Sequence, residues 1–301
     1  MADDIRRLIT EQQSTELAEL DRLPTEELVR IMNAEDALVP PAVARAAPAI
    51  AAAIDKIVVR LQAHGRLIYV GAGTAGRMGV IDAVECGPTF NIAPDQVFGI
   101  MAGGPRAVSS ATESVEDDES AGASDLDSYE ITNRDVVVGV SASGRTPYTL
   151  GAVKQARRAG ALTVGLVCNP ESQLSKLVEY PIEIVVGPEV IAGSTRLKAG
   201  TAQKLVLNML STIAMIKLGK TFGNLMVDVR ATNEKLRTRS RRVVELATGV
   251  DGLELDDALS RSGGDAKVAI VMLLANTGPA EARKRLKNSG GRVREALEGG
   301  S

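Results

Sequence analysis

Five short runs of aliphatic and β-branched residues constrain what this chain can fold into more than any other feature of its sequence. They occupy residues 66–70, 96–100, 135–140, 162–167 and 182–186. Several are apolar at every position, as strands are when helices cover both faces of a parallel sheet. The stretches between the runs have the lengths of helical crossovers. This alternation predicts an α/β fold built on a doubly wound, five-stranded parallel sheet flanked by helices.

The chain before the first run carries no strand pattern. Residues 1–44 are polar and Glu-rich, and we expect them to form an N-terminal helical arm. Apolar residues recur on one face of an Ala-rich segment from Pro40 to Ala63, which predicts an amphipathic helix leading into the sheet. We expect the sheet domain to extend over residues 45–235, with a long apolar helix at 198–219.

The last part of the chain has a third character. A basic stretch, most simply the exposed face of a helix, is followed by short helical patterns. We therefore expect residues 236–301 to form a connecting helix and a small, all-helical C-terminal domain of three helices. The three helical patterns cover residues 252–262, 265–276 and 279–297.

Composition limits the class of function. The net charge of −3 argues against a nucleic-acid-binding surface. The two cysteines, Cys86 and Cys168, are too few and too far apart for a disulfide framework or a zinc site. The N-terminal segment lacks the apolar core of a signal peptide, and no apolar run reaches the ~20 residues of a membrane span. We therefore expect a cytoplasmic protein with neither a nucleic-acid nor a membrane partner.

The first of three polar segments that carry chemistry is GAGTAGR at residues 71–77, directly after the first run. Glycines there let backbone N–H groups approach an anion at the start of a helix. The spacing also matches a dinucleotide fingerprint, but the acidic residue that such a site needs about 20 residues later is missing. Gly73, Thr74 and Arg77 are the candidate ligands of this segment.

The second segment, SASGRTP at residues 141–147, follows the third run. Its hydroxyls, its arginine and a proline suited to starting a helix make a plausible phosphate cradle. An ordinary strand-to-helix turn with capping serines is the alternative. The candidate ligands are Ser141, Ser143, Gly144, Arg145 and Thr146.

The third segment, residues 192–201, enters the long apolar helix. Its hydroxyls and cations suit a polyhydroxylated anion, and the candidates are Ser194, Thr195 and Lys198. Helix capping alone would also explain the two hydroxyl residues. Because the loops at the carboxyl ends of parallel strands meet in one crevice, the three segments together predict a site for a phosphorylated small molecule.

Two glutamates lie near these segments. Glu85 follows the first segment on the same predicted helix, and Glu116 lies in an acidic run. Composition alone does not separate Glu116 from its acidic neighbours, since such a run is usually a solvated helix face. His64, the only histidine, precedes the first run and is expected at the surface.

With these residues in view, the chain closely resembles the N-acetylmuramic acid 6-phosphate etherases of bacterial cell-wall recycling. That family belongs to the sugar isomerase (SIS) superfamily, of which the glucokinase regulatory protein is a more distant member. The resemblance covers nearly the whole chain and rests on long motifs in one order. They are EDALVPPAV at 35–43, RLIYVGAGTAGRMGVIDAVECGPTF at 66–90, ATESVEDD at 111–118, DVVVGVSASGRTPY at 135–148 and a 44-residue segment at 193–236.

The resemblance implies a SIS fold and a homodimer with its site near the interface. It also implies that two glutamates catalyse removal of D-lactate from N-acetylmuramic acid 6-phosphate, without a metal or another cofactor. They fall on Glu85, which would protonate the leaving oxygen and then activate water, and on Glu116, which would remove the C2 proton. Ala75 stands where the family usually has serine, so a ligand role for position 75 is in doubt.

Two other functions on the same fold stay open. An aldose–ketose sugar-phosphate isomerase commonly uses a histidine to open the sugar ring, and His64 is poorly placed for that step. A sugar-phosphate sensor without catalytic activity would not need the glutamates, and both of them are present here in their motifs.

Overall fold

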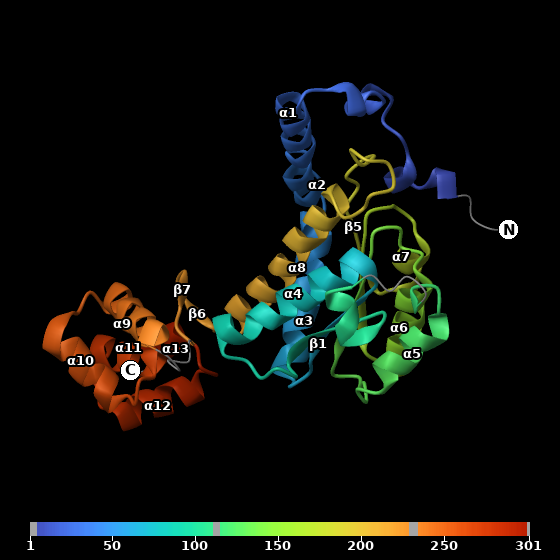
Figure 1. Cartoon of the computed structure of the whole chain (residues 1–301). Helices are drawn as coiled ribbons and strands as arrows, with labels where there is room; N and C mark the ends of the chain where they lie inside the picture. Colours follow the sequence, from blue (N-terminus) through green and yellow to red (C-terminus); the bar gives the residue numbers. More distant parts are fainter. Residues whose placement is uncertain (1–4, 111–114, 229–233, 300–301) are drawn as a thin grey trace. The chain divides into compact units, whose positions relative to one another are not determined.

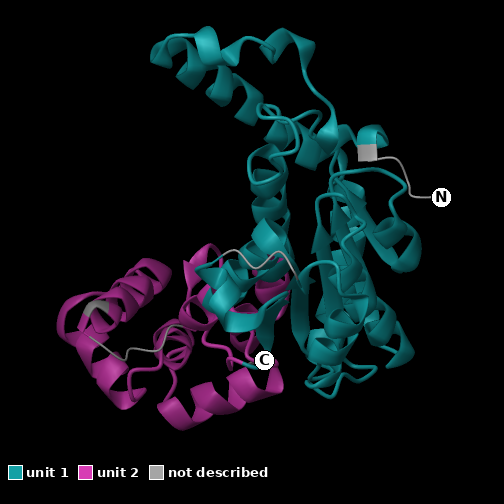
Figure 2. Cartoon of the chain, turned by 45° about the vertical axis from the view of Figure 1, so that its right-hand side comes forward, with its two compact units in different colours: residues 1–84, 95–211 teal, residues 85–94, 212–301 magenta. Residues whose placement is uncertain are grey.

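The computed structural model describes residues 5–110, 115–228 and 234–299. Part of two motifs, at residues 111–114 and 229–233, lies outside these ranges. The chain divides into two compact units, which Figure 2 distinguishes by colour. Unit 1 comprises residues 1–84 and 95–211, and unit 2 comprises residues 85–94 and 212–301. The sequence-based domain boundaries at residues 44/45 and 235/236 are not tested by this division and stay predictions.

Unit 1 contains the predicted parallel sheet. Its strands pair in the order β2-β1-β3-β4-β5, and every pairing is parallel. All residues of β1, β3 and β4 are buried, because helices cover both faces of the central strands. The fold class is confirmed. The bounds are β1 Leu67–Gly71, β2 Val97–Met101, β3 Val136–Ser141, β4 Leu162–Val167 and β5 Tyr180–Glu183, so the fifth strand begins two residues earlier than predicted.

Helices lie on both sides of the sheet (Figure 1), and alternate residues of β1 face these two layers. Ile68 belongs to a buried cluster with Leu126 of α5 (Glu119–Asp127) and Tyr148 of α6 (Pro147–Arg158). Tyr69 points to the opposite face, toward α4 (Gly73–Phe90) and α8 (Lys198–Lys217). The short helix α7 (Gln173–Leu177) packs beside α6.

A buried carboxylate ties that second layer together. Asp82 of α4 is only 5 % exposed, and its oxygens accept hydrogen bonds from the Tyr69 hydroxyl at 2.9 Å, the Asn208 amide at 2.6 Å and the Ser211 hydroxyl at 3.1 Å. Asn208 and Ser211 belong to α8. The two helices are therefore fixed to each other and to β1.

The N-terminal arm consists of short turns of helix and of α1 (Thr25–Asp36), followed by α2 (Val39–Arg45) and α3 (Ala47–Gln62). The single helix predicted over residues 40–63 is in fact α2 and α3, which are separated at Ala46. Pro48 explains the break, because its ring would clash with the carbonyl group four residues earlier in a continuous helix. The four 3₁₀ turns are Ile5–Arg7, Ile9–Glu11, Thr15–Leu17 and Leu20–Arg22.

Within the described residues, no single helix has both the length and the apolar character that a membrane span needs. The bent pair Thr25–Arg45 and Ala47–Gln62, with an angle of 60°, meets them by length and composition alone.

Unit 2 is helical around its own apolar core, which includes Val244, Leu255, Ile270 and Leu286. One predicted helix, at residues 279–297, is two helices, because Gly290 and Gly291 adopt positive φ angles of 60° and 80° and end the first of them. A two-stranded hairpin that the sequence did not suggest precedes the helices. The bounds are β6 Thr221–Phe222, β7 Leu225–Met226, α9 Glu234–Thr248, α10 Gly252–Arg261, α11 Ala266–Leu274, α12 Pro279–Asn288 and α13 Val293–Glu298.

Candidate functional site

The glycine-rich first loop joins β1 to α4 by a very close approach of backbone to backbone. A Cβ atom on Gly71 would lie 2.9 Å from the backbone nitrogen of Gly76 and 2.9 Å from the carbonyl oxygen of Val140. Gly73 has a φ of 52°, a conformation that glycine adopts at little cost. Packing thus requires the glycines and fixes the backbone N–H groups at the start of α4.

The other two candidates of the first loop have identifiable neighbours. The Thr74 methyl group lies 3.3 Å from the position of a Cβ on Gly200, so the first loop contacts the start of α8. The Arg77 guanidinium donates to the carbonyl oxygens of Val108 and Ser110, at 3.2 and 3.1 Å. In this structure Arg77 holds the segment after β2, and its role as a substrate ligand stays a prediction.

The second loop gathers three hydroxyl groups between β3 and α6. The Ser141 hydroxyl lies 2.8 Å from that of Thr146 and 3.3 Å from that of Ser143. Two backbone N–H groups donate to the same hydroxyls, from Gly144 to Ser141 at 3.0 Å and from Arg145 to Ser143 at 3.2 Å. Such a cluster, at the start of a helix and at the carboxyl end of a strand, is suited to an oxyanion.

Glu116 lies between the first and second loops. Its Oε1 atom is 3.0 Å from the position that a Cβ on Gly73 would occupy. Its carbonyl oxygen accepts a hydrogen bond from the Tyr148 backbone N–H at 3.1 Å, just after the second loop. The sequence could not separate Glu116 from the other acidic residues around it, but these contacts do.

Glu85 lies on α4, twelve residues beyond Gly73. Its side chain is exposed, and so are two apolar neighbours, Ile81 at 53 % and Val84 at 65 %. An exposed carboxylate among exposed apolar residues is the setting of Glu85 in a single chain.

The third loop differs from the second because its buried cation and the start of its helix already have carboxylate partners, whereas its Arg196 is exposed. The Lys198 side chain is 2 % exposed, and its ammonium group pairs with Glu35 of α1 at 2.5 Å. The backbone N–H groups of Lys198 and Ala199 each donate to a carboxylate oxygen of Glu189 at 2.9 Å. Ser194 and Thr195 are half-buried before this helix start.

Glu189 therefore occupies the position at which a helix start would bind an anion. It is 1 % exposed, and burial raises its pKa, against the two backbone hydrogen bonds that lower it. Sequence reasoning missed both Glu189 and Glu35. No local signal points to Glu35, which is 163 residues from Lys198 in the chain.

The remaining titratable candidates behave as structural residues. Burial raises the pKa of the Cys168 thiol to about 12, so it stays protonated at neutral pH. Cys86 is also buried, and His64 is exposed at the end of α3, as expected. Within the described ranges, no three His, Cys, Asp or Glu side chains are grouped as a metal site would need.

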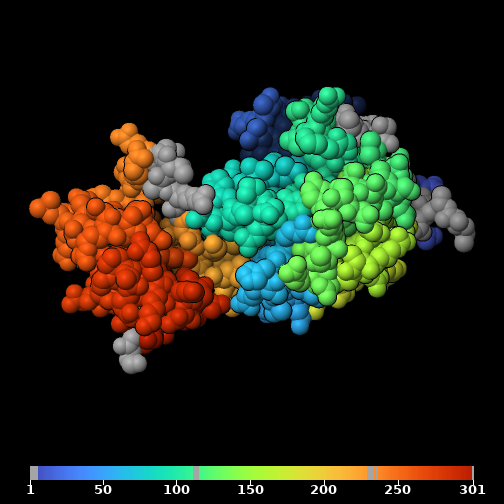
Figure 3. Space-filling model, turned by 90° about the horizontal axis from the view of Figure 1, so that it is seen from below, coloured from blue at the N-terminus to red at the C-terminus, as the bar shows by residue number. Residues whose placement is uncertain are grey.

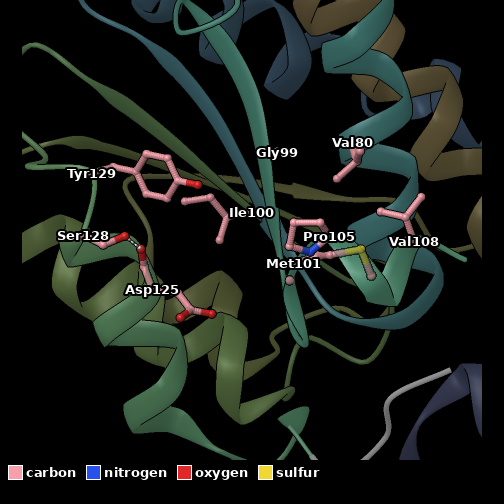
Figure 4. A pocket seen from close by; sticks show the side chains of 10 residues that line it. Val80, Gly99, Ile100, Met101, Pro105, Val108, Asp125, Ser128 and Tyr129 are labelled. Atoms are coloured by element: carbon pink, nitrogen blue, oxygen red, sulfur yellow. Dashed lines mark hydrogen bonds between the residues drawn. The ribbon is translucent and has the colours of Figure 1, made fainter. Parts of the chain in front are cut away.

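A separate pocket of about 340 Å³ lies beside the edge strand β2. Figure 4 shows its wall of apolar side chains and, opposite them, Asp125, Ser128 and Tyr129. The Asp125 carboxylate already accepts a hydrogen bond from the Tyr148 hydroxyl at 2.6 Å. None of the candidate site residues lines this pocket.

Figure 3 shows atoms of α4 and α5 at the surface of unit 1, in cyan and green.

The sheet order and the hydroxyl-rich loop after β3 define a class of protein, the SIS-domain proteins. Family models agree, since "SIS domain" matches residues 118–213 and "Glucokinase regulatory protein N-terminal SIS domain" matches residues 49–157. A solved phosphoheptose isomerase from Neisseria gonorrhoeae shares the fold, with a TM-score of 0.50 and 15 % identity over 64 % of this chain and 98 % of that one.

Within that class, the chain belongs to the family of the N-acetylmuramic acid 6-phosphate etherases. A relative of that name from Rubrobacter xylanophilus is 65 % identical over 99 % of this chain and 98 % of its own. One from Streptomyces coelicolor is 58 % identical over 99 % and 96 %, and one from Escherichia coli strain 55989 is 51 % identical over 98 % and 99 %. The resemblance identified from the sequence motifs is confirmed.

Proposed function

We propose that this chain cleaves the lactyl ether at C3 of N-acetylmuramic acid 6-phosphate, giving N-acetylglucosamine 6-phosphate and D-lactate. Family membership supports this reaction. The structural observation that carries the proposal is the position of Glu116, whose carboxylate lies over Gly73 and whose backbone is bonded at the start of α6. A base is thereby held beside a loop built for an oxyanion.

The second loop is the proposed phosphate site. Hydroxyls of Ser141, Ser143 and Thr146 are close enough to act together on one phosphate group. The start of α6 adds a favourable dipole for the negative charge. With the phosphate bound there, we place the C1 end of the open-chain sugar next to Gly73 and Glu116.

The elimination then requires two proton transfers at neighbouring positions: one removes the hydrogen on C2, and the other protonates the ether oxygen on C3. In the open-chain sugar the C2 hydrogen is α to the C1 aldehyde, so a carboxylate can remove it. We assign this step to Glu116. The C2 electron pair forms the C2–C3 double bond as the C3–O bond breaks, and lactate leaves with a proton supplied by Glu85. Water then adds to C3 with Glu85 as base, and C2 regains a proton.

One carboxylate must start ionised and the other protonated, which different surroundings can arrange. General acid–base steps of this kind each contribute typically ~10²–10⁴-fold to the rate. The mechanism calls for no metal or organic cofactor. The cytoplasm is the proposed compartment, since the substrate is a phosphorylated intermediate of cell-wall sugar recycling.

A homodimer brings the two glutamates to one substrate. The groups on C2 and C3 of a sugar are neighbours, so both carboxylates must reach adjacent atoms of one substrate. A second copy can provide Glu85 to the Glu116 site. The exposed Ile81 and Val84 beside Glu85 supply the apolar surface that such an interface needs.

The central experiment is an assay of lactate release. The purified chain with N-acetylmuramic acid 6-phosphate should release D-lactate without added metal or nucleotide. Loss of activity in EDTA that a divalent ion restores would exclude the metal-free mechanism. Binding of the substrate without lactate release would favour a sensor, and conversion of an aldose to a ketose phosphate would favour an isomerase.

Isotope exchange separates the two glutamates. Glu116→Gln should lose exchange of the C2 hydrogen with deuterated solvent, because it removes the base. Glu85→Gln keeps the base, so it should still exchange this hydrogen while it releases little lactate. The opposite pattern would exchange the two roles, and full activity of either variant would remove that residue from the mechanism.

A further inference from the structure

The first part of the N-terminal arm has one short segment that is buried against the rest of unit 1. Among residues 6–38, Leu8 and Thr10 are the only two buried side chains, at 6 % and 0 % exposure. Helix α1 has no buried residue. Besides the ion pair of Glu35 with Lys198, the buried segment around Leu8 and Thr10 is therefore where this stretch packs into the unit.

The docking contacts are directional hydrogen bonds to two loops. The backbone N–H of Ile9 donates to Asn169 Oδ1 at 2.7 Å, and Asn169 Nδ2 donates to the Thr10 hydroxyl at 3.0 Å. The carbonyl oxygen of Thr10 accepts from the backbone N–H of Gly193 at 3.3 Å. Because a backbone N–H can only donate, its bond to Asn169 fixes which atom of the amide is oxygen.

Asn169 carries the connection into the phosphate loop. Its Nδ2 atom also donates to the carbonyl oxygen of Ala142, at 2.9 Å. Asn169 is buried, with 3 % of its surface exposed. Ala142 stands between Ser141 and Ser143, two of the three clustered hydroxyl residues. A single buried amide thus joins Thr10 of the arm to the backbone of the second loop.

We propose that the segment Leu8–Glu11 is an integral part of the sugar-phosphate site, in which Thr10 and Asn169 act as positioning residues that set the affinity for phosphate. The arm fixes the second loop through Ala142 and the third loop through Gly193. Neither Thr10 nor Asn169 needs to touch the substrate. The inference rests on the proposed function of the second loop as the phosphate site.

The physical basis is preorganisation. Hydroxyl and N–H groups bind an oxyanion well only when they are already held in place, so a less firmly held loop binds phosphate more weakly. Removing the Thr10 hydroxyl leaves a buried Asn169 N–H without that acceptor. The amide can then turn away from Ala142, whose carbonyl oxygen keeps only its bond from the Cys168 backbone N–H at 3.0 Å, and the loop is held less firmly.

The test compares two identical chemical changes on the same arm. Thr10→Val removes the buried hydroxyl at nearly constant volume, whereas Thr15→Val makes the same change at an exposed position. Thr10→Ser restores the hydroxyl. The measurements are the dissociation constant of inorganic phosphate by calorimetry, KM and kcat for N-acetylmuramic acid 6-phosphate, and Tm.

Thr10→Val should weaken phosphate binding and raise KM by about 5- to 30-fold, the size expected for one unsatisfied buried hydrogen bond. The value of kcat should stay within about threefold of the wild type, while Thr15→Val and Thr10→Ser keep wild-type affinity. A purely structural role would lower Tm and leave the affinity of the folded protein unchanged, and this result would overturn the inference.

Asn169→Asp serves as a second variant if Thr10→Val does not fold. It keeps the acceptor for Ile9 but lacks the donors to Thr10 and Ala142, so it should weaken phosphate binding at least as much. Wild-type affinity in this variant would overturn the inference. A wild-type chain that binds phosphate without releasing lactate would refute the proposed reaction but not the positioning role. A wild-type chain that binds neither phosphate nor the sugar phosphate would refute both.

Discussion

The second and third loops have similar residues and very different surroundings. Each has hydroxyls, a cation and a helix that follows. In the second loop, hydroxyls and N–H groups bond among themselves and remain half-exposed at Ser143 and Thr146. In the third loop, Glu189 occupies the helix start and Glu35 neutralises Lys198.

The difference teaches that positive charge near a site is not the same as an available anion site. Lys198 and the start of α8 are each held by a carboxylate, so a phosphate bound there would have to displace groups that are already well bonded. Arg196 of the same loop is exposed. In the second loop the clustered donors are neutral hydroxyl and N–H groups. We therefore expect phosphate binding to depend on the second loop and stability to depend on the third.

The largest effect should come from breaking the ion pair of the third loop. Glu35→Gln leaves the Lys198 ammonium buried at 2 % exposure, so we expect a loss of about 3 kcal/mol in the free energy of unfolding. Lys198→Met should lose less, because the Glu35 side chain is 26 % exposed and can regain water. Urea denaturation of both single variants and the double variant measures the coupling. In variants that fold, KM should change less than twofold. A clear rise in KM with little loss in the free energy of unfolding would make Lys198 a substrate ligand.

The next effect tests the second loop. Ser143→Ala and Thr146→Ala should each raise KM, with about 1–3 kcal/mol at stake for a partner left unsatisfied. Their kcat should change little, because phosphate contacts are equally present before and during the reaction. Ser194→Ala is the matched control on the third loop and should leave KM within about twofold of wild type. If only the control variant raised KM, the phosphate would belong to the third loop.

The smallest effect concerns the protonation of Glu189. Burial raises its pKa above the ordinary value of 4.5, so the folded chain keeps this proton to higher pH than the unfolded chain does. Its contribution to the free energy of unfolding is therefore full below pH 4.5 and declines as pH rises through the raised pKa. Glu189→Gln should remove this decline, and urea denaturation at several pH values from 4.5 to 7 would detect it. An exposed control, Glu16→Gln, should keep the wild-type pH dependence.

The sheet could be predicted from the sequence because its information is local. A strand buried on both faces is a continuous apolar run, and β1 to β4 lie within one residue of the predicted positions. The fifth strand is displaced because it lies at the edge, where only one neighbour, β4, pairs with it and its burial is incomplete.

The partners of the site could not be predicted, since they are far apart in the chain. Lys198 and Glu35 are 163 residues apart, and Asn169 and Thr10 are 159 apart. Nothing near Lys198 in the sequence distinguishes a neutralised lysine from a free one. The glycines could be predicted better, because the close approach at Gly71 depends on its own strand and the turn that follows.

Asp82 has an evolutionary consequence. Its carboxylate is bonded to Tyr69, Asn208 and Ser211, so replacing one member removes a hydrogen bond from a largely buried polar network. Single replacements at these positions should be purged, whereas a simultaneous change to apolar residues of matching shape can be nearly neutral. We therefore expect positions 69, 82, 208 and 211 to vary together among relatives. Either all four residues are retained, or several of them are replaced at once.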